Sequence, residues 1–324
     1  MSKPLFIISA PVDTYSGYGA RSRDIVKAII ATDRYDVKLL SQRWGNTRFG
    51  YLGDHSEDDM ISRIIPHVDQ NKQPDYWMQI TVPNEFTKVG KFNIGCTAGM
   101  ETTLVAPSWI EGVNRMDLVL TSSRHSKQVF EATSYETVNK QTNQKGFLKC
   151  ETPVEIVFEG VDIKKYFIKN SELDLSLIKE SFCYLLVGHW MQGDFGEDRK
   201  NVGYTIKTFL ETFKNKKNPP ALILKTSVVN TSVLDRDRIL SRIDSIKNTV
   251  NGRLPNVYLL HGELTDKNMN ELYNHSKVKV MVSHTKGEGF GRPLLEFTTT
   301  GKPIIASGWS GQVDFLDKEK SILI

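Results

Sequence analysis

One stretch decides the fold: Gly287-Glu288-Gly289-Phe290-Gly291-Arg292-Pro293-Leu294-Leu295-Glu296. The apolar run before it, residues 278–283, predicts a buried parallel strand, and residues 294–300 predict a helix with Pro293 near its first turn. In an open α/β sheet, the loop between such a strand and helix lies at the carboxyl end of the strand, where ligands bind.

This loop combines two kinds of binding group. Its glycines leave backbone N–H groups accessible and the start of the following helix is positive, which together suit a phosphate. Glu288 and Glu296 repel phosphate but accept hydrogen bonds from hydroxyls. The stretch therefore predicts a ligand with both phosphates and hydroxyls, such as a nucleotide sugar. The alternative is an ordinary strand-to-helix turn with two solvated glutamates.

The same stretch resembles a known motif. Glu288-Gly289-Phe290-Gly291 with Glu296 is similar to the E-x7-E motif of retaining GT-B glycosyltransferases of the family 4, or group 1, type. Residues 302–306 resemble the next short strand of that family, and residues 307–311 resemble its glycine-bearing loop. The resemblance implies an α/β fold of two Rossmann-like parallel-sheet domains that face a cleft. The compact layout is also similar to that of bacteriophage members.

Composition limits the class of protein. A chain of 324 residues with 39% hydrophobic and 25% charged residues is typical of a globular protein with about two domains. No apolar run reaches the roughly 20 residues of a membrane span, and the first residues lack the features of a signal peptide. Three widely spaced cysteines indicate neither a disulfide framework nor a zinc site, so we expect a cytoplasmic protein, in the host cytoplasm if the chain is viral. The net charge of +4 permits an anionic partner without requiring one.

Strand and helix patterns alternate along the whole chain. In the first half, the patterns predict strands at 5–9, 35–40, 76–82, 92–97 and 115–123, helices at 21–31, 56–70 and 126–132, and a polar surface excursion at 134–149. In the second half, they predict strands at 182–188, 220–226 and 257–264 and helices at 202–214, 233–248 and 266–276. This alternation predicts parallel sheets in both halves.

Residues 154–162 resemble the segment that ends the first domain in the family. We therefore expect an acceptor-side domain at 1–170 and a nucleotide-sugar-binding domain at 171–324. The chain stops at Ile324 in a predicted strand, where the family continues with further helices. The second domain is thus expected either to be incomplete at its end or to end unusually.

The first half offers two candidate sites. Gly17, Tyr18 and Gly19 form a predicted glycine loop after the first strand, which lets backbone approach a phosphate; a tight turn without a ligand is equally compatible. The loop lacks the third glycine and the acidic residue of a dinucleotide fingerprint, which argues against an NAD enzyme. In the family such a loop faces the donor diphosphate. Glu101, just past a strand end, is a candidate for catalysis or acceptor binding, and it could instead cap the following helix.

Ser123 and His125 have ordinary interpretations. Ser123 is expected to cap the helix at 126–132, and His125 is expected to be a surface or interface histidine rather than a base.

In the second half, Arg199 and Lys200 stand at a loop-to-helix junction, where two cations can bind a diphosphate and stabilise its charge as it leaves. A solvated helix start is the alternative, although cations oppose the dipole there. In the family a lysine stands at the position of Lys200, with an arginine where this chain has His189. Either Arg199 replaces that arginine or phosphate binding is altered. Gly262 and Leu264 resemble the segment whose backbone meets the nucleobase.

The resemblance implies transfer of a hexosyl or pentosyl group from a nucleotide sugar, a UDP-sugar first among the donors, with retention of configuration. In this scheme Glu288 orients the sugar and Glu296 accepts from the ribose. The amides of Gly289, Phe290 and Gly291 bind the diphosphate with Lys200 and Arg199. The family needs neither a metal nor another cofactor. The acceptor is open between a modified DNA base and a glycan, with lipid-linked saccharides, metabolites and proteins as further options. The alternative function is a non-catalytic module that binds a nucleotide sugar or nucleic acid.

Overall fold

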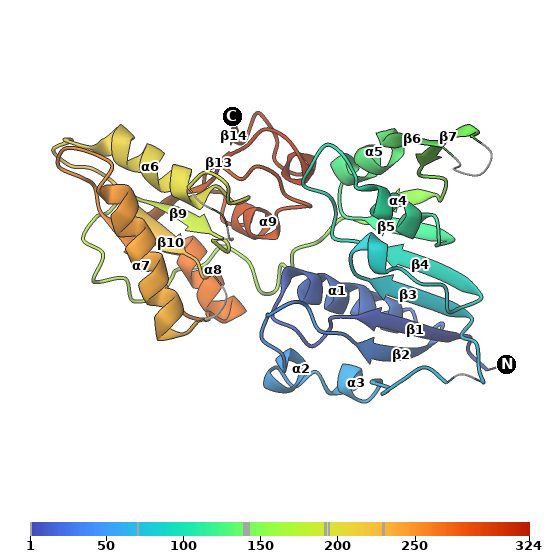
Figure 1. Ribbon diagram of the computed structural model, residues 1–324. Helices are drawn as coiled ribbons and strands as arrows, with labels where there is room; N and C mark the ends of the chain where they lie inside the picture. Colours follow the sequence, from blue (N-terminus) through green and yellow to red (C-terminus); the bar gives the residue numbers. More distant parts are fainter. Residues whose placement is uncertain (1, 70, 139–142, 191–192, 194, 229–230) are drawn as a thin grey trace. The chain divides into compact units, whose positions relative to one another are not determined.

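The computed structural model describes residues 2–69, 71–138, 143–190, 193, 195–228 and 231–324 (Figure 1). The chain divides into two compact units, Met1–Glu159 and Gly160–Ile324. Both are α/β units built on parallel sheets, as the alternation of patterns predicts.

The first unit contains a parallel sheet with the strand order β2-β1-β3-β4-β5-β8. The strands are β1 (Leu5–Ala10), β2 (Asp36–Ser41), β3 (Tyr76–Ile80), β4 (Phe92–Cys96), β5 (Leu118–Thr121) and β8 (Val154–Ile156). Its helices are α1 (Gly17–Ala31), α2 (Tyr51–Asp54), α3 (Asp58–Ile61), the 3-10 helix η1 (Pro83–Glu85), α4 (Pro107–Val113) and α5 (Arg124–Ala132).

Successive side chains of each strand point to opposite faces of this sheet, so apolar side chains stand on both faces and helices cover both. Ile8 of β1 lies in one hydrophobic core with Val26 of α1. Ile7, the preceding residue, lies in the opposite core with Ile110 of α4 and Phe130 of α5. The strand therefore contributes to two cores, which is typical of a doubly wound Rossmann-like fold.

In the first unit, one expected helix is wrong, and one expected surface segment is exposed as predicted but has more regular structure. The helix expected at 56–70 is only the short α3, because Ile64 pairs with Leu39 in a parallel bridge beside β2 and Pro66 follows it. The surface excursion expected at 134–149 contains an antiparallel hairpin, β6 (Ser134–Val138) with β7 (Lys145–Lys149); residues 139–142 lie outside the described part.

The second unit contains a parallel sheet with the order β11-β10-β9-β12-β13-β14. Numbered from β9, this is the 3-2-1-4-5-6 order of the Rossmann fold. The strands are β9 (Cys183–Val187), β10 (Ala221–Lys225), β11 (Val257–Leu259), β12 (Val278–Ser283), β13 (Ile304–Ala306) and β14 (Ile322–Leu323). The helices are α6 (Val202–Phe213), α7 (Val233–Lys247), α8 (Asp266–Asn274), α9 (Arg292–Thr298) and the 3-10 helix η2 (Gly311–Asp314).

Two cores again flank the sheet of the second unit. Leu185 of β9 packs with Leu272 of α8 and Phe297 of α9. Leu186, its neighbour, packs on the other face with Ile206 of α6 and Ile239 of α7. The loops that join these strands to these helices therefore leave the carboxyl edge of the sheet toward opposite faces.

The division between the units comes after Glu159, eleven residues before the expected position at 170. The segment that follows Glu159 packs onto the second unit: Tyr166 and Ile178 lie in its core. Lys169 Nζ also lies 2.9 Å from a carboxylate oxygen of Glu271 on α8. A polar sequence that resembles a linker is here anchored by tertiary contacts, which the sequence pattern does not reveal.

Candidate functional site

The candidate site of the second unit lies where the strand order reverses. The sheet is wound outward in both directions from β9 and β12, which are neighbours. The loops after these two strands therefore leave toward opposite faces, and open α/β sheets bind ligands between loops arranged in this way. They also contact each other, because Lys286 N donates to Arg199 O over 2.9 Å. Glu288 and Lys200, widely separated in sequence, thus lie at one end of one sheet.

Glu288 is buried between two cations. Lys200 Nζ contacts Glu288 Oε1, and Arg199 Nη1 lies 3.6 Å from Glu288 Oε2. Arg199 also donates to the carbonyl of Gly287 over 2.7 Å. Burial acts to raise the pKa of Glu288, but the charges of Lys200 and Arg199 outweigh it and hold the pKa below its ordinary value. The two cations that the sequence predicts for diphosphate binding therefore both lie beside this carboxylate.

The backbone of Glu288 is held by the loop after β13. Glu288 N donates to Ser310 Oγ over 3.0 Å, and Ser310 Oγ donates to Glu288 O over 2.6 Å. Gly311 N donates to the same carbonyl over 2.9 Å. The sequence placed residues 307–311 near this region but assigned no role to Ser310.

Glu296 lies one turn into α9, and its side chain is largely buried. Its Oε2 accepts from the hydroxyl of Tyr273 over 3.2 Å, and Arg292 Nε lies 3.5 Å from its Oε1. Burial raises the pKa of Glu296 from its usual 4.5 to about 7, although Arg292 and Tyr273 oppose the increase. The carboxyl group therefore changes charge near neutral pH. Tyr273, which is fully buried on α8, is a contact that the sequence pattern did not reveal.

His189 follows β9 but does not contact Glu288. Its Nδ1 lies 3.0 Å from Ser227 Oγ, at the end of β10. Partial burial and the nearby charge of Lys200 lower the pKa of His189, which favours the neutral ring. The sequence left open whether His189 or Arg199 stands in the place of the family's arginine. Arg199 is the one that lies beside Glu288.

Gly262 and Leu264 lie after β11, on the other side of β9. Lys225 Nζ donates to the carbonyl of Gly262 over 2.7 Å, and the glycine has a φ of 125°, a conformation that disfavours side chains. The Leu264 side chain packs against the core beside α8. Any contact of Leu264 with a base would therefore come from its backbone.

The second unit contains the segment that matches a known family. Residues 247–323 match the family model described as glycosyl transferases group 1. The match contains Glu288, Glu296 and the Ser310 loop. No curated protein sequence matches the chain significantly.

Solved structures share the fold of the whole chain at low sequence identity. Sucrose-phosphate synthase (tll1590) from Thermosynechococcus elongatus aligns with a TM-score of 0.62 and 12% identity, covering 99% of this chain and 86% of that one. HepE (Alr3699) from Anabaena, in complex with UDP-glucose, aligns with a TM-score of 0.60 and 14% identity, covering 97% and 83%. The lipopolysaccharide outer core galactosyltransferase WaaB aligns with a TM-score of 0.54 and 14% identity, covering 97% and 83%. The chain therefore has the GT-B fold.

The expected glycine loop of the first unit is in fact the first turn of a helix. Gly17 begins α1, and Ser16 caps it by accepting from Gly19 N over 2.9 Å. A Cβ on Gly19 would lie 2.4 Å from the carbonyl oxygen of Thr14, so packing requires this glycine. The expectation that Gly19 belongs to an open loop is wrong, because the serine cap starts the helix earlier.

Tyr18 points into the first unit. Its hydroxyl lies 3.0 Å from Thr97 Oγ1 and accepts from Ala98 N over 3.1 Å, just after β4. Its ring stacks on Trp44 at a centroid distance of 3.8 Å, and burial raises its pKa to about 12. Tyr18 therefore links the segment after β4 with Trp44 in the segment after β2.

Glu101 lies partly buried in the segment after β4. It does not cap the next helix, because α4 has Ala106 at its N-cap position. The neighbouring Met100 N donates to Ser126 Oγ over 2.8 Å, which ties this segment to α5. Ser123 caps α5 by accepting from Ser126 N, which confirms that prediction. His125 Nε2 lies 3.0 Å from the carbonyl of Thr102.

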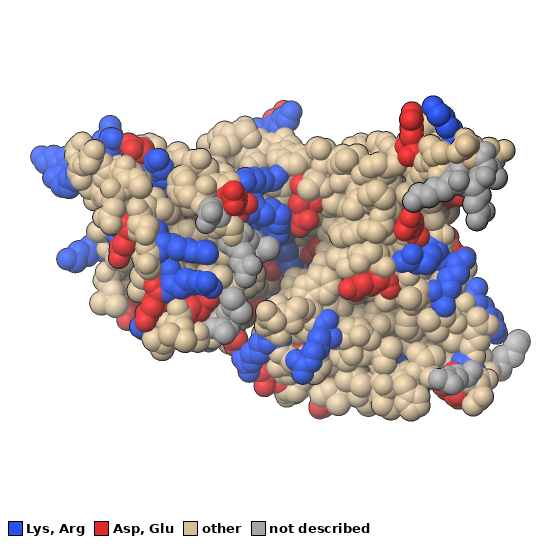
Figure 2. All heavy atoms as spheres, viewed as in Figure 1, with Lys and Arg blue, Asp and Glu red and all other residues tan. Residues whose placement is uncertain are grey.

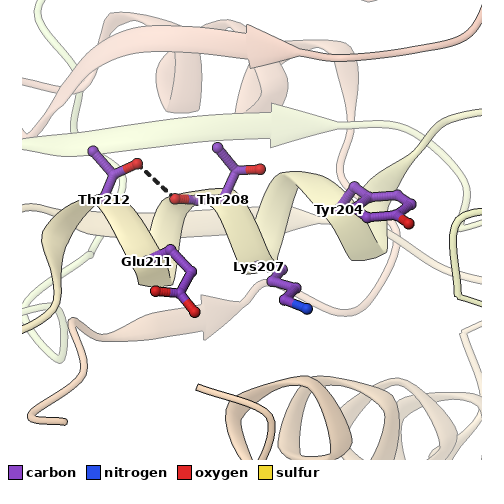
Figure 3. A pocket seen from close by; sticks show the side chains of 5 residues that line it. All are labelled: Tyr204, Lys207, Thr208, Glu211 and Thr212. Atoms are coloured by element: carbon purple, nitrogen blue, oxygen red, sulfur yellow. Dashed lines mark hydrogen bonds between the residues drawn. The ribbon is translucent and has the colours of Figure 1, made fainter. Parts of the chain in front are cut away.

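An open hollow of about 420 Å³ lies on the exposed side of α6, where one helix alone supplies its lining: Tyr204, Lys207, Thr208, Glu211 and Thr212 (Figure 3). The described residues include no group of three or more His, Cys, Asp or Glu side chains that could hold a metal ion. In the same described part, no helix is long and apolar enough to cross a membrane.

Proposed function

We propose that this chain is a glycosyltransferase that moves a sugar from a nucleoside diphosphate sugar to an acceptor with retention of configuration. The observation that carries the proposal is the burial of Glu288 between Lys200 and Arg199 at the topological switch point. Glu288 itself lies in the segment that matches glycosyl transferases group 1. A carboxylate and two cations at such a crevice suit a ligand that carries both hydroxyls and phosphates.

Each charged residue has a role in the proposed step. The bond between the sugar C1 and the phosphate oxygen breaks, and the diphosphate gains negative charge that Lys200 and Arg199 stabilise. The acceptor oxygen forms the new bond to C1 on the same face, and its proton passes to the leaving phosphate. Glu288, ionised at neutral pH because its pKa is lowered, accepts from sugar hydroxyls and orients the ring. Glu296 accepts from the ribose. No protein nucleophile is required.

We propose a UDP-sugar as the donor. Two structures of similar fold are described with such ligands, HepE with UDP-glucose and the E. coli trehalose-6-phosphate protein with UDP-2-fluoro glucose. The first unit would bind the acceptor, with Glu101 as the candidate contact.

The acceptor would be a glycan or a modified DNA base. Figure 2 shows Lys and Arg side chains interspersed with Asp and Glu on the face drawn, rather than a continuous basic patch, so on that face the charges do not favour DNA over a glycan. The three cysteines are free, which fits a reducing compartment, and we therefore propose a cytoplasmic location.

The test measures release of nucleoside diphosphate from a panel of UDP-, GDP- and ADP-sugars. Glycans and DNA with modified bases serve as acceptors, and NMR determines the configuration of the product. Glu288→Gln should reduce the rate at least about 100-fold. The matched control, Glu319→Gln, changes an exposed carboxyl of the same unit and should leave the rate unchanged. A wild-type chain that binds a donor but turns it over with no acceptor would favour the alternative, a non-catalytic binding module.

A further inference from the structure

Ser310 has a backbone conformation that glycine normally occupies. Its φ of 72° and ψ of −161° lie in a region essentially restricted to glycine, because a Cβ crowds the backbone there. The residue stands just before the 3-10 helix η2 and is only 3% exposed. A strained residue of this kind persists only where its surroundings fix it, and such residues concentrate at functional sites. The contacts of the Ser310 side chain show why a serine occupies this position.

The hydroxyl of Ser310 makes two hydrogen bonds, both to the backbone of Glu288. It accepts from the Glu288 N–H and donates to the Glu288 carbonyl. A glycine at position 310 would remove the strain but could make neither bond. Ser310 thus keeps the two hydrogen bonds of its hydroxyl although its backbone is strained.

The next residue shows how closely the two loops approach. A Cβ on Gly311 would lie 2.2 Å from the carbonyl oxygen of Gly289, which only glycine avoids. The backbone of Glu288 is therefore held by the loop after β13, while its carboxylate is held by Lys200 and Arg199. A catalytic side chain has to be held to within about 0.5 Å of its productive position, and contacts at both ends of Glu288 serve that need.

We propose that Ser310 is a positioning residue, whose hydroxyl fixes the Glu288 backbone so that the carboxylate meets the sugar in the orientation that the transfer step requires. This inference rests on the function proposed above. It assigns to Ser310 a role in turnover that acts through Glu288.

Two substitutions separate this role from a purely structural one. Ser310→Gly and Ser310→Ala both remove the hydroxyl, but only glycine relieves the backbone strain, so the glycine variant should melt at the higher temperature. If the hydroxyl positions Glu288, both variants should lose about 10- to 100-fold in kcat with little change in the donor KM, whatever their order of stability. Amide hydrogen exchange of Glu288 should also accelerate in both, while that of β12 stays slow.

Ser56 provides the matched control. It has a positive φ of 51° in the first unit. Ser56→Gly and Ser56→Ala should therefore differ in stability in the same direction, without any change in kcat.

Two results would overturn the inference alone: wild-type kcat in Ser310→Gly, or kcat values that follow the melting temperatures of the two Ser310 variants. A folded wild-type chain that releases nucleoside diphosphate from no donor would instead overturn the proposed function and this inference together. Reduced kcat in both variants, with Glu288 exchange accelerated and the Ser56 variants normal, would support it.

Discussion

Replacing Glu296 with glutamine should make the protein more stable at high pH while it weakens donor binding. Glu296 is mostly buried, and burial raises its pKa to about 7. Below pH 4.5 the carboxyl is neutral in both the folded and the unfolded chain, so it carries no ionisation penalty. Between pH 4.5 and 7 the unfolded chain ionises this group while the folded chain does not, and stability falls as pH rises. Above pH 7 the penalty is constant.

The magnitude follows from the difference between the two pKa values. A shift from 4.5 to about 7 corresponds to about 3 kcal/mol of folding free energy, at about 1.4 kcal/mol per pH unit. Glutamine has a similar shape and does not ionise, so Glu296→Gln should avoid this penalty. The quantity to compare is the melting temperature of Glu296→Gln minus that of the wild type. For a unit the size of Gly160–Ile324, this difference should be roughly 6 to 12 °C larger at pH 8 than at pH 4.5.

The assay is thermal melting of the wild type and Glu296→Gln from pH 4 to pH 9, each compared with Glu319→Gln as the exposed control. The difference in melting temperature between the Glu296 variant and the wild type should grow between pH 4.5 and 7 and then level off. A difference that does not change with pH would show that Glu296 ionises in the folded protein as it does in the unfolded chain, and the burial argument would be refuted.

Three further predictions concern neighbouring residues. Tyr273→Phe removes a hydrogen bond that lowers the pKa of Glu296, so the pH midpoint of donor binding, measured by calorimetry, should move upward; an unchanged midpoint would count against the contact. Lys200→Met removes one of the two described cations beside the buried carboxylate and should cost about 3 kcal/mol in denaturant unfolding and about 100-fold in kcat. Normal values of both quantities would contradict that assignment. Gly19→Ala should destabilise the first unit by about 1–3 kcal/mol because its Cβ would meet a carbonyl oxygen at 2.4 Å, whereas Gly17→Ala, with open space around it, should be tolerated; equal melting temperatures would contradict this.

The order of strands and helices could be predicted because each buried parallel strand is a short apolar run between polar segments. Residues 278–283 form β12 as predicted, and the loop that follows meets Lys200 because both loops leave adjacent strands. That proximity follows from the Rossmann strand order alone. The motif and the general topology therefore sufficed to bring Glu288 and Lys200 together.

What the sequence did not reveal depends on tertiary contacts or on backbone angles. The Ser310 hydroxyl reaches a residue 22 positions earlier, and its strained φ cannot be inferred from a serine in a polar loop. The contact between Tyr273 and Glu296 joins two helices through side chains that look like ordinary core and surface positions. The start of α1 was predicted too late because Ser16, directly before the predicted glycine loop, caps the helix and lets it begin at Gly17.

The packing of residues 160–178 onto the second unit affects how this chain can be divided and recombined. Tyr166 lies beside Tyr273 at a ring-centroid distance of 6.1 Å, and its hydroxyl donates to Asp266 over 3.3 Å. In a chimera joined to a related chain at Ser171, the segment before Ser171 would come from the other protein. Tyr273 would then pack against a side chain of that protein in the core of the second unit. A junction at Gly160 transfers the second unit with all of these neighbours, and chimeras with related chains should use it.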